Sequence, residues 1–314
     1  MVGRSGRRFD HIGDVEVFVA VAEHGSLTAG ALALATTPSV VSRAIARLEA
    51  RLGSQLLRRT TRRQGLTDAG LRYLDQARQA FALIDDAERA MQGQEGELRG
   101  RVRLSASTTY GHYRLPPVLR RFAQQYPQVQ IDLHIGNRNV DLVADGFDLA
   151  IRFGDLPDSG MVARKLEDAT LCLVAAPAYV AQAGMPADIA ALQQHLCVSF
   201  VMPNDGHIMP WAFRDQGRDV TWTPTSRINI SDDVLGMVSL VEQGLGICQT
   251  YDFIVRERLA RGSLVEVLPQ YRGRTRPFSV IYAPHRSLSA AARAMIDMLV
   301  DYEHPSVVQA LPLS

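Results

Sequence analysis

The chain has 314 residues, of which 46% are hydrophobic and 21% are charged. That length exceeds a typical single domain and supplies apolar side chains for two or three cores. The net charge is only +1, but residues 1–66 contain ten arginines and five acidic residues, so this region carries +5 and the remainder −4. A basic head on a slightly acidic body is expected when only the head meets phosphate groups.

Membrane insertion and secretion are not indicated. No apolar run reaches the roughly 18 residues that span a bilayer, and no signal-peptide core follows the arginine-rich N-terminus. We therefore expect a cytoplasmic protein without a membrane partner. Arg4, Arg7 and Arg8 form either a flexible basic arm or a disordered terminus without a role, and the sequence leaves both open.

The N-terminal region begins with two predicted helices. The first starts near Asp14, and its packing face is Val15, Phe18, Val19 and Ala22. Ser26 can cap a second helix over residues 27–34, because its hydroxyl accepts an N–H that the first turn leaves free. Small residues let this helix approach the first closely: Ala29, Gly30, Ala31 and Ala33.

A third helix is predicted to begin at Pro38. Thr37 can act as its N-cap, and proline fits the first helical position, where its missing N–H costs no hydrogen bond. The apolar stripe of this helix is Val40, Val41, Ile45, Leu48 and Leu52. Side chains that can donate to phosphates and base edges project elsewhere: Ser39, Ser42, Arg43 and Arg47. We expect these four to contact the major groove of DNA.

The segment from Gln55 to Leu66 is predicted to be a β-hairpin, with Gly65 relaxing its return. It carries four arginines, Arg58, Arg59, Arg62 and Arg63. A solvated charge run is the alternative interpretation. The position of the arginines directly after a recognition-type helix favours contact with the DNA backbone, and the three helices and the hairpin together predict a winged helix-turn-helix.

A single long helix is predicted from Thr67, its candidate N-cap, to Met91, since no proline interrupts this segment. It would extend roughly 37 Å. Its apolar residues recur at three- and four-residue steps: Leu71, Leu74, Ala77, Ala80, Phe81, Ile84, Ala87 and Met91. We interpret this stripe as a homodimerisation surface, with packing on the C-terminal body as the alternative. The glycine-rich residues 93–100 then predict a hinge.

Beyond the hinge, short strands alternate with helices, which predicts an α/β body with mostly parallel sheets. In the first lobe we expect strands at 102–105, 130–135, 149–153 and 278–282, and helices at 115–126, 140–144 and 289–302. Residues 169–175 should cross to a second lobe. That lobe should hold strands at 195–200, 223–230, 246–250 and 264–268, and a helix after Asp232.

The cleft between two such lobes is the default ligand site. The best candidate in it is Ser107-Thr108-Thr109, because hydroxyls and N–H groups near a helix N-terminus favour a carboxylate or a similar anion. Tyr110, His112 and Arg152 could face the cleft too, and the sequence does not rank them. Ser231 is a weaker candidate, since it serves more readily as the N-cap of the next helix.

Catalytic and metal-binding motifs are not found. Cys172, Cys197 and Cys248 lie far apart in apolar runs without a C-x-x-C pair, which favours buried reduced thiols over a metal site or a redox pair. No G-x-S-x-G elbow, H-E-x-x-H helix or phosphate-binding loop occurs. We expect a protein that is not an enzyme and that needs no cofactor or metal.

The segment GSLTAGALALATTPSVVSRAIARLEARLGSQLLRRTTRRQGLTDAG resembles the DNA-binding domain of LysR-type transcriptional regulators. The resemblance implies a recognition helix that presents Thr37, Pro38, Ser39, Ser42 and Arg43, and a wing that grips the adjacent backbone. Ala35 departs from the glycine that many members have at the corner, which implies either a negative-φ turn or some strain. The candidate DNA contacts are Ser26, Thr28, Thr37, Pro38, Ser39, Ser42, Arg43, Arg47, Arg58, Arg59, Arg62 and Arg63.

The C-terminal body resembles, more loosely, the effector domain of the same family, an α/β two-lobed fold like that of periplasmic binding proteins (type 2). The resemblance implies effector contacts in addition to Ser107 and Ser231: Thr108, Thr109, Asn137, Phe153, Phe200, Val201 and Met202. Simpler roles stay open. The threonines can act only as caps, Asn137 only in a turn, and Phe200 only in the core.

The predicted plan is an N-terminal all-α winged helix-turn-helix domain (1–66), a linker and dimerisation helix (67–92), a hinge (93–100), an effector domain (101–302) and a tail (303–314). Lobe 1 is expected at about 101–172 and 275–302, and lobe 2 at about 173–274. The predicted function is LysR-type transcription regulation, in which a small anionic effector changes the geometry of a homodimer or homotetramer on double-stranded DNA, with RNA polymerase as a further partner. The alternative is a two-lobed small-molecule-binding protein whose N-terminal helices mediate protein contacts.

Overall fold

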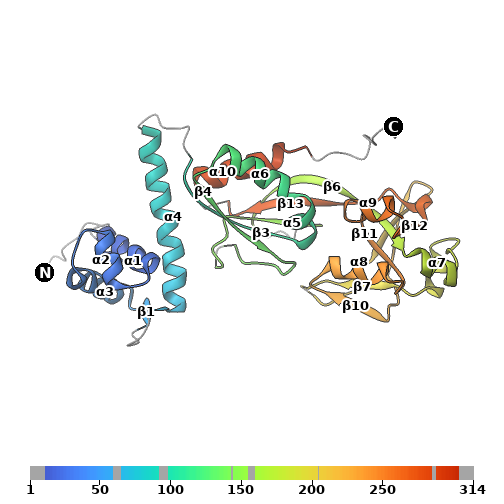
Figure 1. The fold of residues 1–314 in the computed structure, drawn as a ribbon, viewed down its shortest axis with the longest axis horizontal. Coiled ribbons are helices and arrows are strands. Elements are labelled where there is room, and N and C mark those ends of the chain that lie inside the picture. Colours follow the sequence, from blue (N-terminus) through green and yellow to red (C-terminus); the bar gives the residue numbers. More distant parts are fainter. Residues whose placement is uncertain are drawn as a thin grey trace. The chain divides into compact units, whose positions relative to one another are not determined.

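The structure, a computed structural model, describes residues 11–58, 65–91, 98–142, 144–154, 160–203, 205–284 and 288–303 (Figure 1). The chain divides into two compact units, an N-terminal one that ends at Gly96 and a C-terminal one that begins at Glu97. Several predictions therefore lie outside the described residues, namely those for the arginines at 4, 7, 8, 59, 62 and 63, most of the hinge, and the tail beyond Glu303.

The N-terminal unit contains the predicted helices and the base of the hairpin. Its elements are α1 (Ile12–His24), α2 (Leu27–Ala33), α3 (Pro38–Leu52), β1 (Leu57–Arg58), β2 (Gly65–Leu66) and α4 (Asp68–Met91). Ser26 caps α2 by accepting the N–H of Ala29 at 3.1 Å, and Thr37 caps α3 by accepting the N–H of Val40 at 3.4 Å. The caps and the first residue of α3 are those that the sequence predicts.

One apolar core holds this unit together. Buried side chains of α1, α3 and the β1 region meet those of α4 in a single cluster: Val15, Phe18, Val21, Ala31, Val41, Ile45, Leu48, Leu56, Leu57, Leu74 and Ala77. The approach of α2 to α1 depends on Gly30, because a Cβ atom there would lie 2.9 Å from Cα of Val21. That distance is too short for any larger residue, so glycine is required by packing at this position.

The corner of the helix-turn-helix carries backbone strain. Ala35 adopts φ +50°, the left-handed conformation that costs an alanine roughly 1–2 kcal/mol. Its N–H donates to the carbonyl of Leu32, and the N–H of Thr36 donates to the carbonyl of Ala31, so the turn is fixed by hydrogen bonds. Of the two alternatives that the sequence left open at Ala35, the structure therefore adopts the strained one.

The C-terminal unit is an α/β body of two lobes joined by long strands. Lobe 1 contains β3 (Gly100–Ala106), α5 (Thr108–Tyr113), α6 (Leu115–Gln125), β4 (Val129–Ile135), β5 (Leu149–Phe153), the first part of β6 (Val162–Ala175), β13 (Thr275–Tyr282) and α10 (Ala290–Asp301). Lobe 2 contains α7 (Pro177–Ala183), η1 (Ala190–Gln194), β7 (Val198–Val201), β8 (Trp211–Asp215), β9 (Arg218–Trp222), β10 (Ile228–Ser231), α8 (Val234–Glu242), β11 (Ile247–Tyr251), α9 (Asp252–Ala260), β12 (Val265–Val267) and η2 (Pro269–Tyr271).

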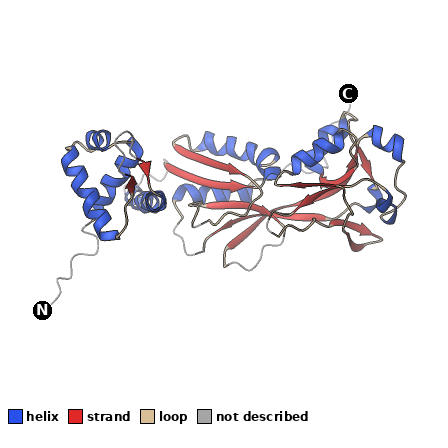
Figure 2. Ribbon diagram, turned by 90° about the horizontal axis from the view of Figure 1, so that it is seen from below, coloured by secondary structure: helices blue, strands red, loops and turns tan. Residues whose placement is uncertain are grey.

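A single sheet runs through both lobes. Its strand order is β11-β6-β13-β5-β3-β4, and β12 also pairs with β6. The first part of β6 pairs with β13, and its last residues, Leu171–Ala175, pair with β11. Figure 2 shows the strands continuing from one lobe into the other with helices packed along them.

Several details of the predicted body are wrong. The sheets are not mostly parallel: β3 is parallel to β4 and β5, and β7 to β10, but β6 and β13 run in opposite directions between the lobes and pair antiparallel. The predicted helix at 140–144 is not found in the described residues of this segment, 140–142 and 144, which form an irregular stretch with turns. The β8–β9 hairpin was not predicted. Asp233, and not Ser231, caps α8 by accepting the N–H of Leu235 at 2.9 Å.

Within the described residues, no single helix is long and apolar enough to cross a membrane. The pair α1 and α2 passes that test only when the two are counted together across a bend of 116°. Both helices contribute buried residues to the core of the N-terminal unit.

The strain at Ala35 predicts that Ala35→Gly stabilises the N-terminal unit. Glycine removes the steric cost of φ +50° but adds freedom to the unfolded chain, so we expect a net gain of about 0.5 to 1 kcal/mol in chemical denaturation. The same change at Ala46, exposed within α3, should instead lower stability by about 1 kcal/mol. A loss of stability in both variants would contradict this account.

Candidate nucleic-acid interface and effector cleft

One face of α3 is buried and the other presents a polar row. Val41, Ala44, Ile45 and Leu48 are buried in the core of the N-terminal unit. Pro38, Ser39, Ser42 and Arg43 are exposed, and the Arg43 Nε donates only to the carbonyl of Ser39, at 3.4 Å. The structure thus brings together three of the four side chains predicted to contact the major groove, on the first two turns of the helix.

The fourth, Arg47, is held by the protein itself. Its Nε donates to Oδ2 of Asp14 at 3.0 Å, and its Nη2 donates to the other carboxylate oxygen. This hydrogen bonding raises the pKa of Arg47 and ties α3 to α1. We therefore infer that Arg47 fixes the orientation of α3 relative to α1 in the protein without DNA. The sequence did not indicate this role.

The remaining described candidates for DNA contact have mixed environments. The hydroxyls of Ser26 and Thr37 serve as helix caps, whereas Thr28 is exposed on α2. Arg58 lies 3.6 Å from Asp68, and both side chains are largely exposed. An exposed pair of this kind contributes little and is screened by salt, so Arg58 can exchange its partner for a phosphate.

The apolar stripe of α4 has two parts. Leu74 and Ala77 are buried in the core of the N-terminal unit, and Phe81 packs partly against it, so these residues do not face a partner helix as predicted. A second set on α4 is exposed and follows at steps of four, three and four residues: Ala80, Ile84, Ala87 and Met91. Such spacing is typical of a helix seam.

In the C-terminal unit, a cavity of about 450 Å³ opens between the lobes. Lobe 1 contributes Arg138 and Asn139 from the loop after β4, and lobe 2 contributes the other lining residues, Val201, Met202, Pro203, Gly206, Ser231 and Asp232. Three residues of the predicted effector set, Val201, Met202 and Ser231, therefore line it. The walls combine apolar side chains with charged and polar groups, as small-molecule sites commonly do.

The predicted anion-binding loop is turned inward. Ser107 and Thr109 are buried, and neither hydroxyl has a hydrogen-bond partner among the described residues. The N–H of Thr108 donates to Oδ1 of Asn137 at 3.0 Å, and Nδ2 of Asn137 donates back to the Thr108 hydroxyl at 2.8 Å. The chain's own carboxamide thus occupies the position at the start of α5 that the sequence assigned to an effector anion.

Asn137 also joins the two lobes. Its Nδ2 donates to the carbonyl of Asp232 at 2.8 Å, and the guanidinium of Arg138 lies 3.4 Å from the Asp232 carboxylate. The sequence reasoning missed Arg138, Asn139 and Asp232. The polar run Asn137-Arg138-Asn139 directly after a parallel strand was the available signal, since ligands bind at the carboxyl ends of such strands.

The two predicted aromatic walls have different surroundings. Phe200 is 3% exposed and belongs to the main core, whereas Phe153 is half-buried and packs edge-on against Phe278. Neither is among the residues that line the cavity. Their predicted contacts with the effector stay predictions.

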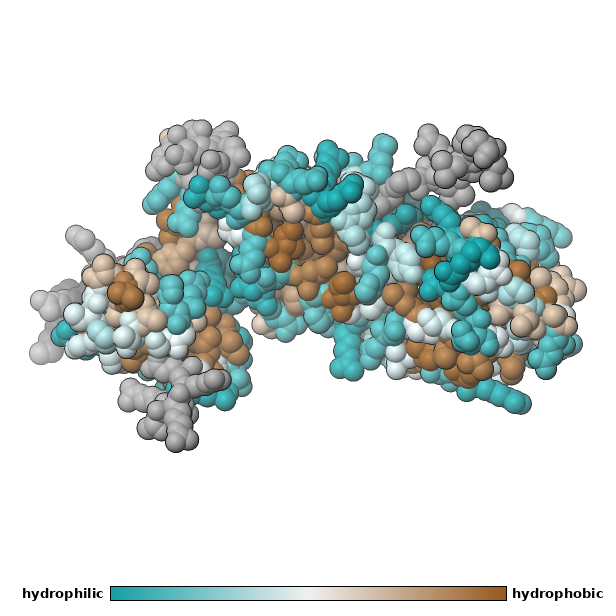
Figure 3. Space-filling view, in the orientation of Figure 1, coloured by the Kyte–Doolittle hydropathy of each residue, from teal (hydrophilic) through white to brown (hydrophobic). Residues whose placement is uncertain are grey.

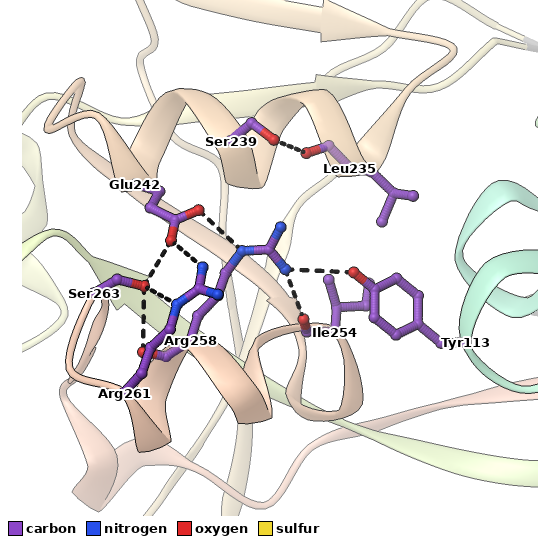
Figure 4. Close-up of polar contacts among 8 residues, drawn as sticks. All are labelled: Tyr113, Leu235, Ser239, Glu242, Ile254, Arg258, Arg261 and Ser263. Atoms are coloured by element: carbon purple, nitrogen blue, oxygen red, sulfur yellow. Dashed lines mark hydrogen bonds and ion pairs between the residues drawn. The ribbon is translucent and has the colours of Figure 1, made fainter.

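A polar cluster of lobe 2 centres on Glu242 at the end of α8, and one of its members contacts lobe 1 (Figure 4). Its carboxylate accepts hydrogen bonds from Ser263 at 2.6 Å, from Arg261 at 2.7 Å and from Arg258 at 3.0 Å. Arg258 on α9 also donates to the Tyr113 hydroxyl of α5 at 3.3 Å. These contacts fix α8 to α9 and connect both to lobe 1.

Residues 12–71 match the model of the bacterial regulatory helix-turn-helix protein, lysR family, and residues 95–303 match that of the LysR substrate binding domain. The chain belongs to the LysR family. Both halves of the fold predicted from the sequence are thereby confirmed.

Relatives of this LysR-family chain are transcriptional regulators. An HTH-type transcriptional regulator of Xanthomonas campestris pv. campestris (strain 8004) is 34% identical over 291 aligned residues. The alignment covers 92% of this chain and 84% of that regulator. The structure of CrgA, a LysR-type transcriptional regulator from Neisseria meningitidis, aligns with a TM-score of 0.58 at 31% identity over 92% of this chain and 97% of its own. The full-length structure of the Vibrio cholerae virulence activator AphB aligns with a TM-score of 0.56 at 28% identity, over 93% of this chain and 99% of its own.

The cysteines of this LysR-family protein are buried and free of disulfides. Burial raises the pKa of Cys172 and of Cys197 to about 12 and raises that of Cys248 as well. A thiol at neutral pH is a poor nucleophile and a poor metal ligand. In the part of the chain that the structure describes, no group of histidine, cysteine and acidic residues could hold a metal ion.

The Glu242 cluster predicts a pH-dependent contribution to stability. Hydrogen bonds from Ser263, then from Arg261, lower the pKa of Glu242 from 4.5 to about 2. A carboxyl whose pKa is lower in the folded state stabilises above the unfolded pKa and loses that contribution as pH falls through the folded one. We expect Glu242→Gln to be less stable than the wild type at pH 7 by about 1 kcal/mol, and the difference to close between pH 4.5 and about 2.

Urea unfolding of the full chain at several pH values measures this difference. Glu257→Gln provides the control, because Glu257 is exposed on α9 and makes no ion pair among the described residues. A Glu242→Gln difference that does not change with pH would show that the substitution acts through packing and not through charge.

Proposed function

We propose that this protein is a sequence-specific DNA-binding transcriptional regulator that responds to a small effector bound between its lobes, and that it catalyses no reaction. The observation that carries the proposal is the exposed row Ser39, Ser42 and Arg43 on a capped helix whose opposite face is buried. Because the proposed target of the protein is chromosomal DNA, we also propose that the protein is cytoplasmic.

The two kinds of contact have different tasks. Hydrogen bonds to base edges select sequence, and we assign these to Ser39, Ser42 and Arg43. Ionic contacts with phosphates supply affinity without selection, and we assign these to the arginines of the wing, from Arg58 to Arg63. The net charge of +5 on residues 1–66 supports this assignment.

We further propose that the protein acts as a homodimer through α4. The exposed seam of Ala80, Ile84, Ala87 and Met91 is apolar, and Met91 is 87% exposed in the single chain. A tetramer requires a second surface, and Figure 3 shows apolar side chains gathered on the face of lobe 1. Leu133 of β4, which belongs to this lobe, is 37% exposed. RNA polymerase is the further partner that an activator would require.

The effector can act only if it favours one arrangement of the lobes over another. The contacts of Asn137 and Arg138 with Asp232 join lobe 1 to lobe 2 beside the cavity, so a ligand there competes with them or reinforces them. This coupling is the route by which we propose that a bound effector changes the geometry of the oligomer.

The proposal is tested by binding of the full chain to fragments around its own gene, at low and moderate salt with random competitor DNA. Saturable binding that resists the competitor supports it. No binding at low salt would favour a two-lobed small-molecule-binding protein whose N-terminal helices contact another protein.

Arg43→Ala should reduce selectivity, whereas Arg62→Ala should reduce affinity for every sequence. For Arg43→Ala we expect the ratio of specific to random binding to fall about 10- to 100-fold, since a base contact is worth roughly 1–3 kcal/mol. For Arg62→Ala both constants should fall by a similar factor. Fluorescence anisotropy measures them, and Arg121→Ala, which removes an exposed arginine of α6, is the charge-matched control. Equal losses on both DNAs for both variants would refute this division.

Ile84→Asp should dissociate the dimer. A carboxylate placed in an apolar seam must be desolvated without a partner, so the sedimentation coefficient should fall toward that of a monomer. Leu71→Asp is the matched control, because Leu71 is also exposed on α4 but lies 13 residues away, far around the helix axis at about 100° per residue. Unchanged sedimentation of Ile84→Asp would exclude this seam.

A further inference from the structure

Glu49, in the last turn of α3, accepts hydrogen bonds from the backbone that leads from α3 into the wing. Its Oε1 accepts the N–H of Leu56 at 2.8 Å and that of Leu57 at 3.1 Å. Its backbone carbonyl accepts the N–H groups of Gly53 and Ser54, which follow the helix. A carboxylate makes hydrogen bonds roughly twice as strong as those of a neutral acceptor. One residue of the recognition helix therefore binds both ends of the connection to the wing.

The start of α4 binds the same connection from the other side. The Thr67 hydroxyl donates to the carbonyl of Gln55 at 2.7 Å and accepts the N–H of Gly70 at 2.9 Å, and the Thr67 N–H donates to the carbonyl of Leu56 at 3.0 Å. The approach is so close that a Cβ atom at Gly70 would collide with the carbonyl oxygen of Leu56. We call these contacts of Glu49 and Thr67 with residues 55–57 the wing clamp.

The wing clamp fixes which side chains of β1 point outward. Leu57, whose N–H it binds, is buried in the core of the N-terminal unit, and the next residue, Arg58, is exposed. Because side chains alternate along a strand, a slip of one residue would turn the arginine inward. In the described part of the hairpin, β1 pairs with β2 only at Leu57 with Leu66 and at Arg58 with Gly65. The wing clamp therefore supplies contacts that hold this register.

The end of α3 does not require the Glu49 side chain. Gly53 already ends the helix in the left-handed conformation, at φ 64°, with its N–H on the Glu49 carbonyl. A negative charge near a helix C-terminus is unfavourable by roughly 0.3 to 1 kcal/mol, because the carbonyl ends of the helix dipole point there. The carboxylate is explained by the two N–H groups that it accepts beyond the helix.

We propose that Glu49 is the positioning residue of the wing. By binding the N–H groups of Leu56 and Leu57, it holds Arg58 where this arginine reaches a DNA phosphate while α3 lies in the major groove. The inference rests on the proposed DNA-binding function. It joins the two kinds of DNA contact, since the helix that selects sequence also places an arginine that supplies affinity.

The test compares Glu49→Gln with Glu49→Met. Both variants lose the same charge and keep a similar volume, but only glutamine keeps an oxygen that accepts the two N–H groups. Fluorescence anisotropy measures binding of the full chain to a random-sequence DNA duplex between about 50 and 200 mM salt. Each phosphate contact contributes about −0.9 to the slope of log affinity against log salt. We expect Glu49→Met to make this slope less negative by at least about 0.9, and Glu49→Gln to keep the wild-type slope.

Arg58→Ala then separates positioning from folding. In the wild type it should make the slope less negative by about 0.9, because one phosphate contact is lost. In Glu49→Met it should change the slope little, since the arginine is already displaced from the phosphate. Arg121→Ala, which removes an exposed arginine of α6, should leave the slope unchanged in both backgrounds.

Three results would overturn the inference: a wild-type slope in Glu49→Met, equal slopes in Glu49→Gln and Glu49→Met, or an equal effect of Arg58→Ala in both backgrounds. Should Glu49→Met fail to fold, Thr67→Val takes its place, because it removes the hydroxyl that binds Gln55 on the other side of the wing clamp. A wild type that binds no DNA at the lowest salt would instead refute the regulator proposal, and this inference with it.

Discussion

The antiparallel pairing of β6 with β13 is the constraint on which the C-terminal unit depends. β6 has 14 residues, and it pairs with β13 in lobe 1 before pairing with β11 and β12 in lobe 2. Because backbone hydrogen bonds of one sheet continue through both lobes, the lobes cannot separate without breaking them. What can change is the set of side-chain contacts between them, which includes Asn137 and Arg138 with Asp232, Tyr113 with Arg258, and Arg276 with the carbonyl of Pro210.

Polar groups are distributed unevenly around that sheet. Glu242 collects three donors and is fully satisfied, whereas Arg152 is buried with neutral acceptors alone. The first arrangement is what a structural ion cluster requires. The second leaves a charge that the described part of the fold does not compensate.

In the N-terminal unit, helix α4 has one side buried in the core and another side exposed. The side of α4 that carries Leu74 and Ala77 completes the core of the helix-turn-helix, and the side that carries Ile84 and Met91 is exposed. A partner that covers the second side is therefore linked to α1 through Tyr73 and Phe18, whose rings lie 5.8 Å apart, and to α3 through the shared core. Arg47 adds to this rigidity by binding Asp14.

Local rules sufficed where a short segment decides its own structure. The caps Ser26 and Thr37, the start of α3 at Pro38 and the length of α4 follow from hydrogen bonding and periodicity within a few residues. The resemblance of the first 70 residues then indicated the family. Contacts between distant residues were decided only by the tertiary structure, since no local pattern shows that Arg47 meets Asp14, that Asn137 occupies the start of α5, or that Arg152 is buried against Ser105 and the carbonyl of Arg138. The left-handed corner at Ala35 belongs to the same class, because packing of α2 and α3 on α1 outweighs the preference of one residue.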